Sequence, residues 1–376
     1  MATPAVEFSA VIPVRDDPVR LERLLAGLRE HAPADLLREI IVVDDGSTAP
    51  PEDVCTRHGA AMLRVFPGRG PAHARNAGAA AARGTHIFLF DADVTYAPGA
   101  VEKAAALFAA DPDLSAVSFF NQRYDAADGV VSNFVAVQEH CWFLKCLEDG
   151  GDTGPLGGLM TRNGAIRRDV YEALGGFSED YATNAGEDYD FGKRLVRGHK
   201  SVITASPVFH HAYPTRVTRL FRNYFLRTAL FVPYYLTHKP PLDKAQTSGS
   251  EALTRLAGVG AAGMVPLVFL PVVGGFAGVL FLLLSALYTA LISDFLWAAW
   301  RWCGEGHAKA FDLTGDPDAD VRREIRRGGD RCLRFTAACL LLHWSTSCAI
   351  AAGGVWGLAG HFLSGGKAPG AAGGAP

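Results

Sequence analysis

The residues with the clearest chemical potential are two aspartates, Asp91 and Asp93, in the segment HIFLFDADVTYAPGA at residues 86–100. The apolar run before them predicts a buried strand, so both carboxylates are expected at its carboxyl end. In open α/β sheets that edge is where ligands bind. Within the turn of Asp91, Ala92 and Asp93, one carboxylate could bind a polar ligand and the other a divalent cation, which prefers oxygen ligands. A solvated turn with a helix cap is the structural alternative.

A second acidic strand end lies earlier in the chain. Residues 8–14 form an apolar run that contains Pro13 and ends at Val14, which predicts a first strand with a bent exit. After an amphipathic segment, residues 39–43 predict a buried strand that leads to Asp45. This order of strand, helix and strand favours a parallel sheet with a right-handed crossover. Asp45 could accept hydrogen bonds from a nucleotide, or it could cap a helix.

Basic residues flank the start of an alanine-rich helix predicted at residues 72–82. Arg69 and Arg75 lie there, after a loop that contains Gly68 and Gly70. Positive charge at the start of a helix opposes the helix dipole, and a nearby anion would offset that cost. A diphosphate is a suitable anion, and surface arginines without a ligand are the alternative.

Two further acids, Glu187 and Asp188, begin another predicted helix. The amino end of a helix stabilises negative charge, so Asp188 should stay ionised and could act as a general base toward a hydroxyl. The alternative is that these acids only stabilise the helix dipole, as acids in the first turn of a helix often do.

Histidines and an asparagine complete the candidate set. A strand predicted at residues 201–205 leads to His210 and His211, either of which could complete a metal site begun by Asp93, or be hydrogen-bonded structure instead. Asn163 follows a glycine-rich stretch that predicts a tight bend beside a ligand.

In this order and spacing, the segments resemble the catalytic domain of glycosyltransferase family 2, an inverting family with the GT-A fold. The matching segments are VIPV, VVDDGS, GPAHARNAG, FLFDADV, NGAIRRDVYEALGGF, GEDYDFGKRL and FHH, within about residues 6 to 215. The resemblance implies an α/β protein whose mixed or parallel sheet binds a nucleotide sugar, with a UDP- or GDP-linked donor and Mg²⁺ or Mn²⁺ as cofactor. The residues expected at the nucleotide sugar are Pro13, Val14, Asp45, Arg69, Arg75, Asp91, Ala92 and Asn163.

The resemblance also assigns chemical roles. It places Asp93 on the metal and His210 or His211 in the metal shell. Asp188, with Glu187 beside it, would deprotonate the acceptor. An acceptor oxygen would then attack the anomeric carbon in line with the departing nucleoside diphosphate.

The composition limits the possible partners and compartments. With 49% hydrophobic and 20% charged residues the chain is not disordered, and at 376 residues two parts are expected. A net charge of -3 gives no support for nucleic acid as a partner. The seven cysteines form no CxxC pair, which favours free thiols in a reducing compartment. The first residues lack the features of a signal peptide, so we expect the front of the chain in the cytosol.

The second half of the sequence predicts membrane attachment after a catalytic domain at residues 1–215. We expect an amphipathic interface helix and linker at 216–250, a transmembrane hairpin at 251–302, a basic cytosolic loop at 303–334, a third span at 335–363 and a disordered tail at 364–376. A single tilted span is the alternative for the hairpin, and a buried peripheral helix is the alternative for the third span. The tail would lie outside the cytosol if there are three spans.

These features favour a multi-pass enzyme of the cytoplasmic (inner) membrane with a cytosolic catalytic domain. It would move one sugar from a nucleotide donor to a lipid or lipid-linked acceptor. The sequence has no QxxRW motif, which argues against a processive polysaccharide synthase. A polyprenyl-phosphate sugar synthase and a non-catalytic scaffold that binds nucleotide sugars are the alternatives.

Overall fold

The chain forms two compact units, and one of them is discontinuous in sequence. The computed structural model describes residues 6–123, 129–147, 151–179, 186–238, 249–271, 273–304 and 321–363. The first unit comprises residues up to Gln122 together with Phe143–Ala212, and the second comprises Arg123–Trp142 with Tyr213–Ala368. The chain therefore leaves the first unit, contributes a segment to the second, and returns.

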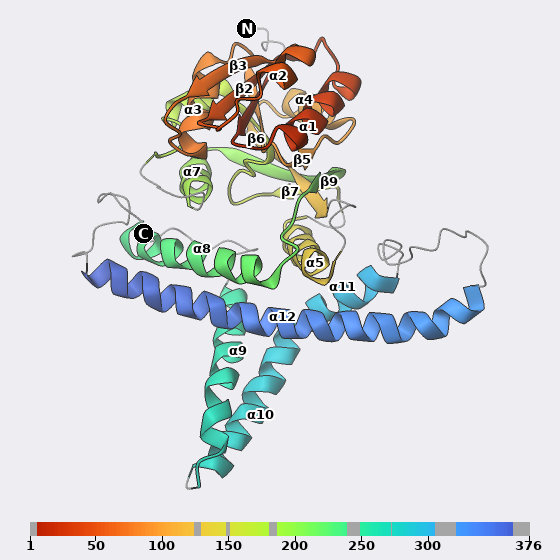
Figure 1. Ribbon diagram of the computed structural model, residues 1–376, viewed down its shortest axis with the longest axis vertical. Helices are drawn as coiled ribbons and strands as arrows, with labels where there is room; N and C mark the ends of the chain where they lie inside the picture. The colour runs from red at the N-terminus through yellow and green to blue at the C-terminus, as the bar shows by residue number, and fades with distance from the viewer. Residues whose placement is uncertain are drawn as a thin grey trace. The chain divides into compact units, whose positions relative to one another are not determined.

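The first unit is built on a mixed sheet (Figure 1). Its strands are β1 (Phe8–Val14), β2 (Leu37–Asp45), β3 (Ala61–Val65), β4 (His86–Phe90), β5 (Val94–Thr95), β6 (Leu114–Arg123), β7 (Thr153–Pro155), β8 (Asn163–Arg167) and β9 (Lys200–His211). They follow the order β3-β2-β1-β4-β8-β6-β9-β5, and β7 also pairs with β9. The pairs β1–β2, β2–β3 and β1–β4 are parallel, whereas β8 is antiparallel to β4 and to β6. The predicted mixed α/β sheet is confirmed.

Helices cover both faces of this sheet. They are α1 (Pro18–His31), α2 (Glu52–Arg57), α3 (Pro71–Ala81), α4 (Ala100–Ala110), α6 (Arg168–Ala173) and α7 (Glu187–Leu195). Alternate residues of β1 enter different cores: Ala10 and Ile12 pack with α1 and α4, whereas Val11 packs with α3 and α7. This division follows from the period of two along a strand.

The alanine-rich helix α3 lies very close to the sheet because its buried residues, apart from Arg75, are alanine and glycine. A Cβ atom added to Gly78 would overlap the Val11 side chain and would lie 3.0 Å from Val43 Cγ2. The start of α3 is therefore held near the carboxyl ends of β1 and β2, where the acidic residues are.

The second unit is helical. It contains α8 (Val217–His238), α9 (Gly249–Val268), α10 (Gly274–Leu291), α11 (Ser293–Gly304), α12 (Val321–Leu363) and most of α5 (Val130–Leu144). Three of its segments are long and apolar enough to cross a membrane: Glu251–Val268, Gly274–Leu291 and Cys332–Leu363. The expected polar linker at 239–248, residues 305–320 of the expected basic loop and the tail at 364–376 lie outside the described residues. Residues 321–334, which were expected to belong to that loop, are helical in α12.

The tight approach of α3 predicts how the first unit responds to added volume. We expect Gly78→Val to lower the unfolding free energy by about 1–3 kcal/mol, because the new side chain must displace Val11 in a packed interior. The melting temperature of the detergent-solubilised full chain measures this. Ala80→Val, on the exposed side of the same helix, is the control. Equal melting temperatures for the two variants would contradict the packing.

Candidate functional site

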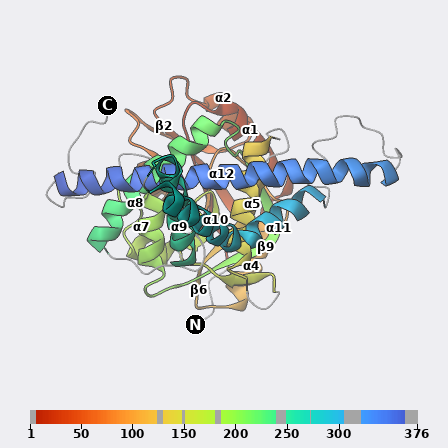
Figure 2. The same ribbon diagram turned by 90° about the horizontal axis from the view of Figure 1, so that it is seen from below.

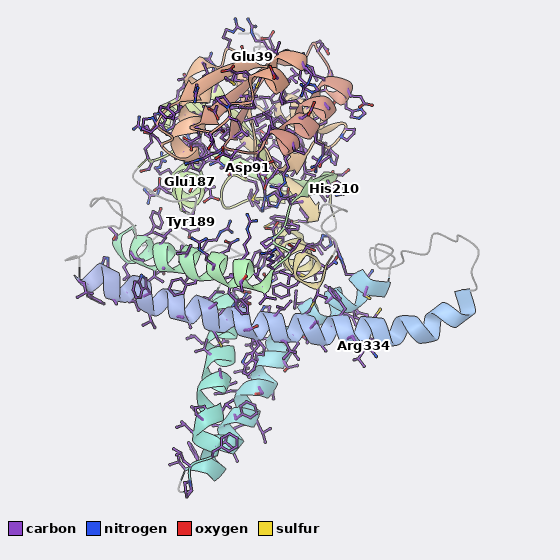
Figure 3. All side chains as sticks on the ribbon, in the orientation of Figure 1. Glu39, Asp91, Glu187, Tyr189, His210 and Arg334 are labelled. Atoms are coloured by element: carbon purple, nitrogen blue, oxygen red, sulfur yellow. The ribbon has the colours of Figure 1, made fainter. Side chains whose placement is uncertain are left out.

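A buried arginine joins two carboxylates at the carboxyl edge of the sheet. Arg75, in the first half of α3, is only 4% exposed. Its Nη2 donates a hydrogen bond to Asp91 Oδ1 at 2.7 Å, and its Nη1 donates to Glu187 Oε1 at 3.2 Å. Asp91 and Glu187 are labelled on the same side of the first unit in Figure 3. Residues from α3, the end of β4 and the start of α7 therefore converge.

The protonation of this cluster follows from burial and charge. Burial lowers the pKa of Arg75, but the Asp91 and Glu187 charges outweigh burial and leave the pKa raised, so Arg75 stays cationic. Burial, reinforced by the charge of Asp188, raises the pKa of Glu187 to about 7 against the pull of Arg75. Within the described structure, Glu187 Oε2 is buried without a hydrogen-bond partner, which fits a carboxyl that is partly protonated near neutral pH.

Asp188 differs from its neighbour in exposure. Its side chain is exposed, and its Oδ1 accepts a hydrogen bond from the backbone N–H of Tyr189 at 2.8 Å. It nevertheless lies close enough to raise the pKa values of Glu187 and Arg75. Of the two acids that begin α7, only Asp188 is thus accessible to an incoming molecule.

The second aspartate of the turn pairs with a histidine. β5 is antiparallel to β9, with Val94 opposite His211. This pairing brings Asp93 Oδ1 to 3.5 Å from His211 Nε2. Burial would raise the pKa of Asp93, but the hydrogen bond and charge of His211 hold that pKa below its ordinary value. In the same pairing His210 is opposite Thr95.

This pair fits part of a divalent-cation site. The described residues contain no group of three His, Cys, Asp or Glu side chains placed to hold a metal. Asp93 and His211 supply one oxygen and one nitrogen donor, and phosphate oxygens and water commonly complete the shell of Mg²⁺ or Mn²⁺ at such sites.

Asp45 is engaged with a loop of the protein. Its carboxylate accepts hydrogen bonds from the backbone N–H of Arg69 at 2.7 Å and from that of Gly70 at 3.0 Å. Asp45 thereby fixes the loop that leads into α3. The Arg69 side chain points to Glu179, with Nη2 donating to Oε2 at 2.9 Å.

The remaining predicted residues lie at the same edge of the sheet. Pro13 and Val14 end β1, and Val14 is opposite Asp44. Ala92 is buried inside the acidic turn. Asn163 is fully buried opposite Phe90, and its Nδ2 donates to Phe119 O and to Asn121 Oδ1, both at 3.0 Å. These hydrogen bonds give Asn163 a structural role within the sheet.

Sequence reasoning missed the residues that hold α7 in place. Asn76 Oδ1 accepts hydrogen bonds from Tyr171 Oη at 2.7 Å and from the Phe177 N–H at 2.9 Å. Arg194 donates to Gly176 O at 2.8 Å and to Asp190. The one available signal was Asn76 itself, because asparagine is a poor helix former in an otherwise alanine-rich helix.

Comparison with known proteins gives consistent matches. Residues 9–175 match the family model described as Glycosyl transferase family 2. The chain is 31% identical over 204 residues to the Pre-mycofactocin glycosyltransferase of Mycobacterium tuberculosis strain CDC 1551 / Oshkosh, and equally to that of strain H37Rv. The match covers 50% of this chain and 39% of each relative, so the chain spans about two fifths of their length.

A solved structure is similar over nearly the whole chain. It is the mannosyltransferase PcManGT from Pyrobaculum calidifontis in complex with GDP-Man and Mn²⁺, with a TM-score of 0.51 and 19% identity. The superposition covers 94% of this chain and 88% of the other. At this identity the similarity establishes a common fold.

The raised pKa of Glu187 predicts a pH dependence of stability. The native state keeps this proton to about pH 7, whereas the unfolded chain releases it near pH 4.5. The stabilising contribution is therefore complete below about pH 4.5 and is lost as the pH rises through 7, by at most roughly 3 kcal/mol. We expect Glu187→Gln to gain melting temperature relative to the wild-type chain between pH 5 and pH 8. Glu102→Gln, on the exposed side of α4, should track the wild type, and a Glu187→Gln profile parallel to both would contradict the assignment.

Proposed function

Residues 9–175 form a glycosyltransferase family 2 domain with the GT-A fold, and from this premise we propose that the protein transfers one sugar from a nucleotide donor to a lipid or lipid-linked acceptor. The observation that carries the proposal is the junction of Arg75 with Asp91 and Glu187, beside the accessible Asp188. It brings acids of two distant segments to one edge of the sheet, where nucleotide ligands bind in α/β proteins.

The donor site would lie along the carboxyl ends of β1, β2 and β4. Pro13 and Val14 would form its floor, and Asp45 would act by holding the loop of Arg69 and Gly70 in position. The Asp91 side chain is 30% exposed, so it can bind the donor while Arg75 fixes its orientation.

The acceptor would be activated by Asp188. An ionised carboxylate within reach of a hydroxyl can remove its proton as the oxygen attacks the anomeric carbon. Glu187 and Arg75 would position α7 so that Asp188 meets the acceptor.

Asp93 and His211 would hold a divalent cation. When bound, such an ion offsets charge on the departing diphosphate. The solved relative with GDP-Man and Mn²⁺ supports a nucleotide-sugar donor and a divalent metal. Mg²⁺ could occupy the same site as Mn²⁺, because the donor atoms of the site suit either cation.

The apolar helices of the second unit support a membrane-bound acceptor. A domain tethered to a bilayer meets substrates that partition into it. We place the protein at the cytoplasmic (inner) membrane with residues 1–215 in the cytosol, where nucleotide sugars would be available. The expected interface helix, hairpin, basic loop and third span belong to this proposal.

Two alternative functions are tested by the variants of Asp188 and Asp93 described below. A polyprenyl-phosphate sugar synthase would use an acceptor that is already ionised. A non-catalytic scaffold would bind nucleotide sugars without turnover.

The proposed roles predict distinct losses of activity. We expect Asp188→Asn to lower kcat at least about 100-fold with little change in nucleotide affinity, because a general base typically contributes 10²–10⁴-fold. We expect Asp93→Ala to weaken Mn²⁺-dependent donor binding as well as turnover. Asp53→Asn, an exposed acid in α2, is the control. The measurement is nucleotide release and sugar transfer with a panel of UDP- and GDP-sugars; tight binding without turnover by the wild-type chain would favour the scaffold.

The chemistry of the acceptor predicts a second difference. With a hydroxyl acceptor, Asp188→Asn should abolish most turnover, whereas with a polyprenyl phosphate the loss should be only a few-fold because no proton must be removed. Parallel assays with an alcohol and a phosphate acceptor, analysed by mass spectrometry of extracted lipids, measure the ratio. Equal losses with both acceptors would argue against a role for Asp188 as base.

A further inference from the structure

The helical unit contains a hairpin whose closed end is entirely apolar. α9 and α10 pack side by side and project away from the other helices of this unit (Figure 1). From Leu256 to Leu284 the sequence has no charged or hydroxyl-bearing side chain. At the closed end Phe269 is 81% exposed and Phe276 is 76% exposed. A loop that emerged into water would be expected to carry polar residues, and this one carries none.

Two backbone hydrogen bonds lie within the described part of this turn. The N–H of Leu270 donates to Leu267 O at 3.1 Å, and the N–H of Gly274 donates to Leu270 O at 2.8 Å. Pro271 has no N–H to satisfy. Hydrogen bonds within the turn favour a location in hydrocarbon, where an unsatisfied backbone group is costly.

The open end of the hairpin is marked by a buried polar junction. Arg255 of α9 pairs with Glu251 at 2.5 Å and donates to His343 O at 3.3 Å and to Ser347 Oγ at 3.2 Å. On the other arm, Tyr288 Oη and His343 Nδ1 are 2.7 Å apart. Arg255 is the first polar side chain that follows the apolar stretch of α9, counted from the turn. Arg255 and Tyr288 both contact His343, so they lie at the same distance along the two arms of the hairpin.

The distance from this junction to the turn is shorter than a bilayer core. From Arg255 to the turn, and from the turn to Tyr288, each arm has about 15 residues, or roughly 22 Å at 1.5 Å per residue. The hydrocarbon core is about 30 Å thick. A hairpin that enters at Arg255 therefore ends inside the bilayer.

Helix α12 runs across the open end of the hairpin, not alongside it (Figure 1). The view from below shows the same arrangement, with the hairpin seen nearly end-on against α12 (Figure 2). Its central residues, His343 and Ser347, are the ones bound to Arg255. As one 43-residue helix it is about 65 Å long, more than twice the thickness of the core. If the hairpin enters the membrane, the middle of α12 lies at the membrane surface.

α12 is joined lengthwise to α8. A Cβ atom added to Gly353 would overlap Phe225 O, and one added to Gly357 would overlap Ala229 O. Equal steps of four residues on both helices show that they run parallel, with glycines that allow close backbone contact.

Exposed apolar residues at Leu341, Val355 and Phe362 recur at multiples of seven and form one stripe of α12. α8 adds exposed arginines at 216, 219, 222 and 227, which suit anionic headgroups.

We propose that the second unit is a monotopic anchor: the α9–α10 hairpin enters the bilayer from the cytosolic side and ends within it, while α8 and α12 lie in the headgroup layer. The partner of the hairpin surface is lipid hydrocarbon. This refines the membrane attachment proposed above, on which it rests, and replaces the third span that composition alone allows. Both ends of α12, and hence the carboxyl terminus, stay on the cytosolic side.

Topology reporters and cysteine labelling test this arrangement in the full chain. We expect a reporter fused after Pro376 to lie on the same side of the membrane as one fused before Met1. In a variant whose seven native cysteines are replaced, Phe269→Cys should resist a membrane-impermeant maleimide in intact cells and in inverted vesicles, and should react in detergent. Asp294→Cys, exposed beyond the open end of α10, should react in inverted vesicles. A reporter on the opposite side, or labelling of Phe269→Cys from outside, would overturn the proposal.

A second pair of variants leaves the native cysteines in place. Phe276→Asp puts a charge at the closed end and should reduce retention in membranes washed with alkaline carbonate, because a charge is strongly disfavoured in hydrocarbon. Phe66→Asp, equally exposed at 75% in the first unit, should be retained like the wild type. Full retention of Phe276→Asp would show that the turn reaches water and would overturn the re-entrant geometry. Loss of the wild-type chain from washed membranes would instead refute membrane anchoring as a whole.

Discussion

The site depends on one constraint, which is that a buried guanidinium must be matched by negative charge. Arg75 is held between Asp91 and Glu187, and a charge without partners at this depth would be strongly unfavourable. Each of the three residues belongs to a different element, so their pairing fixes α3 and α7 against the end of β4. Gly78 contributes by letting α3 lie close enough to the sheet for Arg75 to reach the acidic turn. The same interaction opposes the rise that burial and the charge of Asp188 cause in the pKa of Glu187.

Much of this edge could be predicted because each part has a local signal. The strand that ends at Asp91 is a continuous apolar run, and β1, β2 and α3 lie where periodicity and helix propensity placed them. Parallel strands then bring Asp45 and Asp91 to one edge without further information. The convergence of Asp91 with α7 was predicted from the resemblance, since no local pattern relates residues that are separated by so much of the chain.

The parts that could not be predicted depend on tertiary pairing. Sequence left His210 and His211 equivalent, and the pairing of His211 with Asp93 depends on a contact between β9 and the turn before β5 that no local pattern specifies. Asp45 and Asn163 were expected to bind a ligand, yet both make hydrogen bonds within the protein that no local pattern specifies. For α12, hydropathy predicts a segment of sufficient length and apolar composition, but it does not predict how the helix axis lies relative to the neighbouring helices. That orientation follows from the contacts of His343 with α9 and of Gly353 with α8.

The discontinuity of the helical unit has a consequence for biosynthesis. Phe134 and its neighbours in α5 are made early, but the residues that bury them, including Phe295 and Cys339, are made more than a hundred residues later. An emerging chain must therefore keep an apolar helix shielded, by lipid or by a chaperone, until translation is almost complete. A fragment that stops at Ala212 would carry the first unit together with this orphaned helix, so aggregation of such a fragment would reflect the missing partners of α5 and would say nothing about the first unit itself.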